Sequence, residues 1–322
     1  MNMIIILLSL LFGSLGALVI KKNGFRLDLI DVPNHRSSHK KETPKGGGIG
    51  ILIAFVVSSI CLNISIAFWM PALVLSGISF LGDRFELSIK FRLIIQFVCS
   101  IIFLIDVLFA TEVAIPGITL FIPLSIFIVG TANLYNFMDG IDGIAGITGV
   151  VGFTSIACFG YMSGVDTHYS IFALSIAFAC AGFLVFNFPK AKVFMGDVGS
   201  VLLGFVLACL IIILSRTFLE FICLTGFFFP FYADELVTMF ARLKSGDSLK
   251  KPHRKHIFQL LVNEYGIAHW KISISYGSIQ SMIGLAIFLL KDFGYIYILL
   301  LLLLCFAAFS VFSFIIRTKL SI

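Results

Sequence analysis

The chain has 322 residues, of which 59% are hydrophobic and only 12% are charged. Soluble domains are about 45–50% apolar and about 25% charged, so this composition excludes a soluble enzyme. Its seven cysteines all lie in apolar stretches, which excludes an extracellular disulfide scaffold. The composition indicates a membrane protein that crosses the bilayer several times.

Eleven apolar segments approach the length of about 20 residues that a helix needs to cross a bilayer. In chain order they are 2–20, 49–66, 68–81, 93–110, 118–134, 144–162, 169–188, 201–215, 218–233, 272–290 and 295–316. A hairpin over 49–81, bent at 63–71, would reduce the number to ten. We therefore predict an all-α, polytopic membrane protein with about 11 transmembrane helices in a single domain, 1–322.

Charge sets the predicted orientation. No basic residue precedes the first segment, while Lys21 and Lys22 follow it, which favours a retained helix with its N-terminus outside over a signal peptide. Every lysine and arginine except Arg216 and Lys291 then falls on the cytoplasmic side, as does the C-terminus. The predicted cytoplasmic loops are 21–48, 82–92, 134–143, 188–200 and 234–271. This topology explains the net charge of +6 without nucleic-acid binding.

The first of these loops contains Pro33-Asn34-His35-Arg36 and, further on, Pro44-Lys45-Gly46-Gly47-Gly48. Three glycines let backbone N–H groups approach an anion, although the spacing is not that of a P-loop. A flexible approach to the next helix explains the glycines equally well.

Asn136, Asp139 and Asp142 are spaced by three residues, so that adjacent pairs would share one face of a helix. Gly140 and Gly143 permit a break in the helix or the close approach of a ligand. The alternative is a polar turn whose side chains cap helix ends. A cap needs fewer carboxylates and carboxamides than this segment holds, so we favour a functional site.

In Phe194-Met-Gly-Asp197-Val-Gly-Ser, a carboxylate stands between glycines just before an apolar helix. Such a group binds a hard cation through oxygen, or it caps the helix that begins at Val201. Phe194 is either an interfacial aromatic residue or a platform for a base. The motif alone leaves both alternatives open.

The last basic loop reads Lys250-Lys-Pro-His253-Arg254-Lys255-His256. Lysine and arginine suit phosphate recognition. The alternative is an anchor to anionic lipid headgroups, which explains the lysines better than the two histidines. A zinc site is not supported, because no cysteine lies nearby.

Taken together, these motifs resemble the bacterial polyprenyl-phosphate N-acetylhexosamine-1-phosphate transferases. The resemblance rests on four segments that occur in family order across essentially the whole chain, namely Pro33-Asn34-x-Arg36, Pro44-x-Gly46-Gly47, Asn136-Phe-Met-Asp139-Gly-Ile-Asp142-Gly and Phe194-Met-Gly-Asp197-x-Gly-Ser. The segment His253-Arg-Lys-His256-Ile-Phe-Gln259 resembles the branch that initiates O-antigen. Members of that branch use donors such as UDP-FucNAc or UDP-QuiNAc.

The resemblance implies a set of site residues. Its catalytic aspartates would be Asp83, Asp139 and Asp142, and its magnesium ligand, with Mn²⁺ as an alternative ion, would be Asp197. The implied substrate-binding residues are Lys45, Asn136, Phe194, His253, Arg254 and His256. Phe194 would lie against uracil, and the last three would hold the phosphates of the sugar nucleotide. One position departs from the family, because Gly82 stands where the first aspartate of an Asp-Asp pair is usual.

The expected reaction transfers a sugar 1-phosphate from a UDP-N-acetylhexosamine to undecaprenyl phosphate, with release of UMP, at the cytoplasmic face of the bacterial inner membrane. The product would start a lipid-linked glycan such as O-antigen. A homodimer is left open. A transporter or flippase is the rival, but it should carry charged groups within its spans. Asp106 lies inside the predicted span 93–110, but near its outer end. A non-catalytic scaffold would not need these carboxylates together.

Overall fold

The computed structural model describes residues 2–33, 37–85, 87–110, 116–164, 167–248 and 253–320. These residues form a helical bundle with one short antiparallel strand pair, β1 (Ile30–Asp31) and β2 (Thr43–Pro44). The helices are α1 (Asn2–Asn23), α2 (Ile49–Cys61), α3 (Ile66–Arg84), α4 (Ile89–Ala110), α5 (Pro116–Met138), α6 (Ile144–Met162), α7 (Thr167–Asn187), α8 (Asp197–Leu214), α9 (Phe218–Gly226), α10 (Phe229–Lys244), α11 (Ile257–Asn263), α12 (His269–Leu290) and α13 (Tyr295–Leu320), with a 3₁₀ turn, η1 (Lys291–Phe293).

The prediction of an all-α, multi-pass membrane protein is confirmed. Among the described residues, seven helices are long and apolar enough to cross a bilayer, and the bent pair α9–α10 makes up to eight. The helices α2 and α3 are apolar but shorter. The predicted number of about 11 is not confirmed, because α2 and α3 are short and α4 is not among the helices that pass this test of length and composition.

The predicted continuous span 218–233 is wrong. The chain turns by 83° between α9 and α10. Pro230 lies in the first turn of α10, where its missing N–H is tolerated; inside a continuous helix its ring would clash with the preceding turn. As a result α10 leaves the direction of α9 and carries Asp234 and Glu235 into the interior, where both are buried.

Between α2 and α3 the chain turns at 62–65, and Pro71 lies inside α3 instead of at the bend. Asn63 adopts a φ of 52°, and the Ser65 hydroxyl accepts a hydrogen bond from the Ala67 N–H at the start of α3. The same hydroxyl donates to Asp106 on α4 at 2.7 Å. The one acidic group of this predicted span therefore has a polar partner at the end of the bundle.

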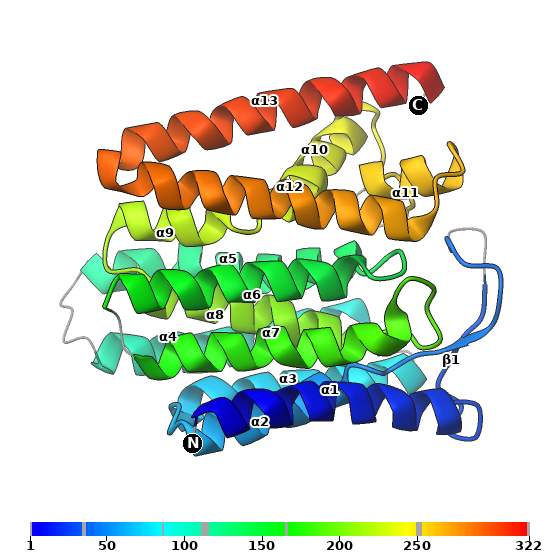
Figure 1. Cartoon of the computed structure of the whole chain (residues 1–322), viewed down its shortest axis with the longest axis horizontal. Coiled ribbons are helices and arrows are strands. Elements are labelled where there is room, and N and C mark those ends of the chain that lie inside the picture. Colours follow the sequence, from blue (N-terminus) through cyan, green and yellow to red (C-terminus); the bar gives the residue numbers. More distant parts are fainter. Residues whose placement is uncertain are drawn as a thin grey trace.

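The long helices run side by side, and the two termini lie at opposite ends of the bundle (Figure 1). The helix α8 occupies the centre, is buried along most of its length, and packs against α3 and α5. A Cβ atom at Gly204 would lie 2.7 Å from the Ala132 Cα, so glycine is needed for this close approach of α8 to α5.

One end of the bundle carries β1, α11 and the C-terminus, together with the loops that follow α5 and α7 (Figure 1). We call it the β1 end. The predicted site residues that the structure describes lie in these segments or next to them. Because successive helices run in opposite directions, these residues meet at one end of the molecule.

Candidate active site

The glycine-rich segment and the Phe194 segment lie side by side. The Phe194 N–H donates to the Pro44 carbonyl at 2.8 Å, and the Gly47 N–H donates to the Phe194 carbonyl at 2.9 Å. Lys45 and Phe194 thereby form a parallel bridge. The His39 ring, which the sequence did not single out, meets the half-buried Phe194 ring edge-on at 4.8 Å. Two predicted substrate-binding residues are therefore neighbours.

Asp197 lies in the first turn of α8, directly after Gly196. Gly196 holds the N-cap position with a φ of 73°, so Asp197 is not the cap that the alternative interpretation required. Its Oδ2 atom lies 2.5 Å from Nη2 of Arg92 at the start of α4, and both side chains are about a quarter exposed. Arg92 is a residue that sequence reasoning missed, since only its position among the cytoplasmic charges hinted at it.

The segment of Asn136, Asp139 and Asp142 is not one helix. The helix α5 ends at Met138, so Asn136 is helical while the two aspartates lie in the loop that follows. The expected shared helix face is wrong, because the chain leaves the helix after Met138 and enters α6 through Gly143 at a φ of 83°. All three polar side chains are partly exposed.

Neighbouring helices hold this acidic segment in place. The Asn187 side chain accepts a hydrogen bond from the Gly143 N–H at 2.8 Å. Nδ1 of His269 lies 3.3 Å from the Asp142 carboxylate, and the Ser273 hydroxyl donates to the Asp142 carbonyl at 2.7 Å. These partners come from α7 and α12, and no spacing in the sequence connects them to the motif.

The basic loop divides into two parts. His253 and His256 face each other with ring centroids 4.8 Å apart. Arg254 is exposed and lies 3.5 Å from Glu264, while Lys255 pairs with Asp247 at 2.6 Å. The structure therefore brings the two histidines together, and Arg254 is paired with a different residue.

Burial decides the charge of the two histidines. It lowers the pKa of His256, which is 4% exposed, from 6.5 to about 3, and nearby Arg317 and Arg242 lower this pKa further. Burial also lowers the pKa of His253 to about 3, with a contribution from His256. Both rings are therefore neutral at pH 7, so they offer hydrogen bonds and carry no positive charge.

The helix α11 connects the basic loop to the acidic segment. A Cβ atom at Gly140 would lie 3.0 Å from the Phe258 ring and 3.0 Å from Nε2 of Gln259. Asn263 at the end of α11 donates to the Ser38 hydroxyl of the first loop at 3.1 Å. The helix α11 therefore contacts both the acidic segment and the first loop at the β1 end.

Some predicted residues fall outside this account. Asn34, Arg36 and the stretch 249–252 lie outside the described residues. Asp83 belongs to the last turn of α3, but its side chain also lies outside the described part. Among the described residues, no three histidine, cysteine or acidic side chains are grouped as a metal site.

The apolar helical bundle defines a multi-pass membrane protein. Carboxylates and basic groups gather at the β1 end of this bundle, which is the candidate active site. The chain belongs to the polyprenyl-phosphate N-acetylhexosamine-1-phosphate transferases, as the ordered motifs predicted. The family described as "Glycosyl transferase family 4" matches residues 65–215.

Relatives align over most of the chain. It is 26% identical to a probable undecaprenyl-phosphate N-acetylglucosaminyl 1-phosphate transferase of Bacillus subtilis, covering 78% of this chain and 74% of the relative. It is 28% identical to the undecaprenyl-phosphate alpha-N-acetylglucosaminyl 1-phosphate transferase of Thermotoga maritima, covering 81% and 82%. A phospho-N-acetylmuramoyl-pentapeptide-transferase of Shouchella clausii is 30% identical, covering 78% and 85%.

Proposed function

We propose that the protein transfers an N-acetylhexosamine 1-phosphate from a UDP-sugar to undecaprenyl phosphate and releases UMP. An oxygen of the acceptor phosphate attacks the phosphorus that carries the sugar, and the bond from this phosphorus to the UMP oxygen breaks. The names of the Bacillus and Thermotoga relatives support the acceptor. The observation that supports the site is the contact between α11 and the acidic segment at Gly140, which brings basic groups and carboxylates together.

Phosphoryl transfer mainly requires that the reacting groups are positioned and that their negative charge is offset. Arg254 and Lys255 supply positive charge, and His253 supplies a neutral hydrogen-bonding group. The acceptor is a phosphate monoester with a second pKa of about 6, so it is largely dianionic at neutral pH. A base is therefore dispensable, and we assign Asp83 to orienting the acceptor. Asn136, Asp139 and Asp142 would line the sugar-nucleotide site.

We propose Mg²⁺, or Mn²⁺, as the cofactor and Asp197 as its protein ligand. The partly exposed carboxylate of Asp197 fits a hard cation by its donor chemistry. Magnesium keeps several waters and usually takes only one or two carboxylates beside substrate phosphates, so a larger cluster of protein ligands is not required. Bound there, the ion would offset charge on the diphosphate.

The site would face the cytoplasm at the bacterial inner membrane, with the N-terminus outside and 11 spans. The positions of the termini at opposite ends of the bundle support an odd number of crossings (Figure 1). The positive-inside rule supports a cytoplasmic β1 end, because the loops at this end carry nearly all the basic residues. The two exceptions, Arg216 and Lys291, lie in the connections α8–α9 and α12–α13.

The donor would be a modified N-acetylhexosamine of the kind that starts O-antigen, as the His253–Gln259 segment suggests. Purified protein should be incubated with undecaprenyl phosphate and radiolabelled UDP-GlcNAc, UDP-FucNAc or UDP-QuiNAc in turn. Label should enter the lipid phase with equimolar release of UMP. Absence of a lipid product with every donor, together with uptake of label into sealed vesicles, would favour the transporter.

A further inference from the structure

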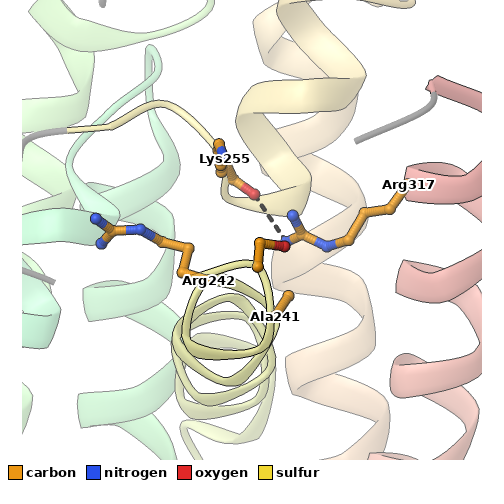
Figure 2. A pocket seen from close by; sticks show the side chains of 5 residues that line it. Ala241, Arg242, Lys255 and Arg317 are labelled. Carbon is orange, nitrogen blue, oxygen red and sulfur yellow. Dashed lines mark hydrogen bonds between the residues drawn. The ribbon is translucent and has the colours of Figure 1, made fainter. Parts of the chain in front are cut away.

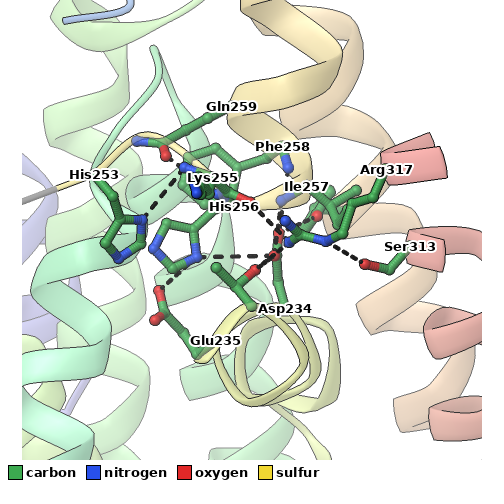
Figure 3. Close-up of polar contacts among 12 residues, drawn as sticks. Asp234, Glu235, His253, Lys255, His256, Ile257, Phe258, Gln259, Ser313 and Arg317 are labelled. Carbon is green, nitrogen blue, oxygen red and sulfur yellow. Dashed lines mark hydrogen bonds and ion pairs between the residues drawn. The ribbon is translucent and has the colours of Figure 1, made fainter. Parts of the chain in front are cut away.

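The carboxylate of Asp234, on α10, is fully buried and receives four hydrogen bonds (Figure 3). The backbone N–H groups of Ile257 and Phe258 donate to it at 2.8 and 3.2 Å. The hydroxyls of Tyr276 and Thr238 donate at 2.5 and 3.1 Å. Asp234 thus caps the first turn of α11 from another helix, because free N–H groups at a helix start need an acceptor.

Arg317, near the end of α13, holds the same loop from the other side. The residue is 7% exposed, and its guanidinium donates to the Lys255 carbonyl at 2.8 Å, the Thr238 hydroxyl at 2.9 Å and the Ser313 hydroxyl at 3.1 Å. The Thr238 hydroxyl accepts from Arg317 and donates to Asp234. One hydroxyl therefore connects the two buried charges.

The small hollow beside this network is not a ligand site. It is lined by Arg242, Lys255 and Arg317, but its volume of about 20 Å³ leaves room for about one water molecule. Figure 2 shows the guanidinium of Arg242 directed away from Arg317, whose own guanidinium is directed to the Lys255 carbonyl. The guanidinium groups do not converge on an anion, and the role of Arg317 is to bind the loop.

The anchored stretch, residues 255–258, lies between the two regions that the reaction requires. It includes His256 and directly follows His253 and Arg254, and Phe258 within it contacts the acidic segment at Gly140. A shift of this stretch would therefore move the phosphate-binding side chains relative to the acidic segment. Asp234 of α10 and Arg317 of α13 hold it by direct hydrogen bonds, and Tyr276 of α12 supports it through Asp234.

We propose that Asp234 and Arg317 are positioning residues, which lock the backbone of residues 255–258 and so set where His253 and Arg254 meet the donor diphosphate. This inference rests on the proposed function for the donor, but the anchoring of the loop can be measured separately. Neither residue touches substrate in this arrangement.

The test compares four variants with the wild type. Arg317→Ala removes the anchor, Arg317→Lys keeps a charged donor, and Tyr276→Phe removes a single hydrogen bond to Asp234. Lys319→Ala is the matched control, since Lys319 is an exposed basic residue in the same last turn of α13. For each, KM is measured for UDP-sugar and for undecaprenyl phosphate, and amide hydrogen exchange is followed over 255–258.

We expect Arg317→Ala to raise the KM for UDP-sugar about tenfold, since the lost hydrogen bonds involve a charged group. The KM for undecaprenyl phosphate should stay unchanged, and exchange over 255–258 should accelerate. Tyr276→Phe should have a smaller effect in the same direction, Arg317→Lys should recover part of the loss, and Lys319→Ala should match the wild type.

The inference would be wrong if Arg317→Ala only lowered the amount of folded enzyme and left the KM for UDP-sugar unchanged. It would also be wrong if amide hydrogen exchange over 255–258 in Arg317→Ala matched the wild type. If Arg317→Ala does not insert, Arg317→Lys and Tyr276→Phe decide the question by the same two measurements. If the wild type lacked transferase activity but its Ile257 and Phe258 amides were protected from hydrogen exchange, the proposed function would be contradicted. The anchoring of residues 255–258 would still be supported. Rapid exchange of both amides in the wild type would exclude the anchor itself.

Discussion

Nη2 of Arg92 lies 2.5 Å from Oδ2 of Asp197, so that the start of α4 is joined to the start of α8 at the β1 end. The pair is only partly buried, and the helix dipole stabilises the negative charge of Asp197 in the first turn of α8. A divalent cation at Asp197 would compete with Arg92 for the same oxygen atom.

Asp197→Asn should abolish transferase activity while the protein still inserts and folds. The substitution removes the charge that a hard cation needs and changes the volume little. A helix-dipole role alone would cost about 0.3–1 kcal/mol of stability and leave turnover intact. The measurement is turnover against magnesium concentration, with Asp292→Asn at an exposed position as the control. Normal magnesium-dependent turnover in Asp197→Asn would rule out the metal role.

The topology can be tested by cysteine labelling in intact cells. All seven native cysteines are first replaced by serine, since Cys61 and Cys158 are exposed. Cysteines introduced at Lys40 and Lys190 should be protected from a membrane-impermeant maleimide, because the positive-inside rule places both in the cytoplasm. Cysteines at Arg216 and Asp292 should react. Labelling of Lys190→Cys from outside would reverse the orientation.

His253→Ala should raise the KM for UDP-sugar, because the neutral ring is placed to hydrogen-bond a phosphate. Loss of one such bond corresponds to about 0.5–1.5 kcal/mol, or up to roughly tenfold in KM. If the loop were only an anchor for anionic lipids, the surrounding lysines would preserve it and kinetics would not change. Lys244→Ala, which removes an exposed charge nearby, serves as the control.

Stability should fall on acidification from pH 6.5 towards 3. The folded-state pKa of His256 is about 3 and the ordinary value is 6.5, so in this window the unfolded chain binds more protons than the folded one. The free energy of unfolding then rises by up to about 1.4 kcal/mol per pH unit for each such histidine. Above pH 6.5 this contribution to stability is fully present. Thermal unfolding in detergent from pH 7.5 to 5 should show this slope, and His256→Asn should reduce it.

Gly82 tests how many carboxylates the loop after α3 needs. Asp83→Asn should be severely impaired and Glu86→Gln moderately so, because Glu86 is the nearest other acid in the chain. Among the described residues, the atom nearest to a Cβ at Gly82 would belong to Leu87, at 3.6 Å, which is an ordinary van der Waals contact. Gly82→Asp should therefore leave activity unchanged or improve it. Full activity in Asp83→Asn would show that acceptor orientation does not depend on this loop.

The helical segments and the family were accessible from the sequence, because both depend on local information. A segment in a bilayer must satisfy its backbone hydrogen bonds within itself, so apolar length predicts helices directly, as for α6 and α7. The motifs in their order identified the family. Pro230 also indicated the break between α9 and α10. Because Pro230 lies within a continuous apolar segment, that segment was predicted as a single span.

Tertiary structure decided which groups meet. Arg92 and Asp197 are 105 residues apart, and Asp234 caps a helix that begins 23 residues later. Hydrophobic periodicity describes only the face of one element, and it cannot say which distant side chain will fill the space opposite. The same holds for His256, whose burial and neutral charge follow from the packing of α10, α11 and α13 around it and not from the basic residues beside it in the chain.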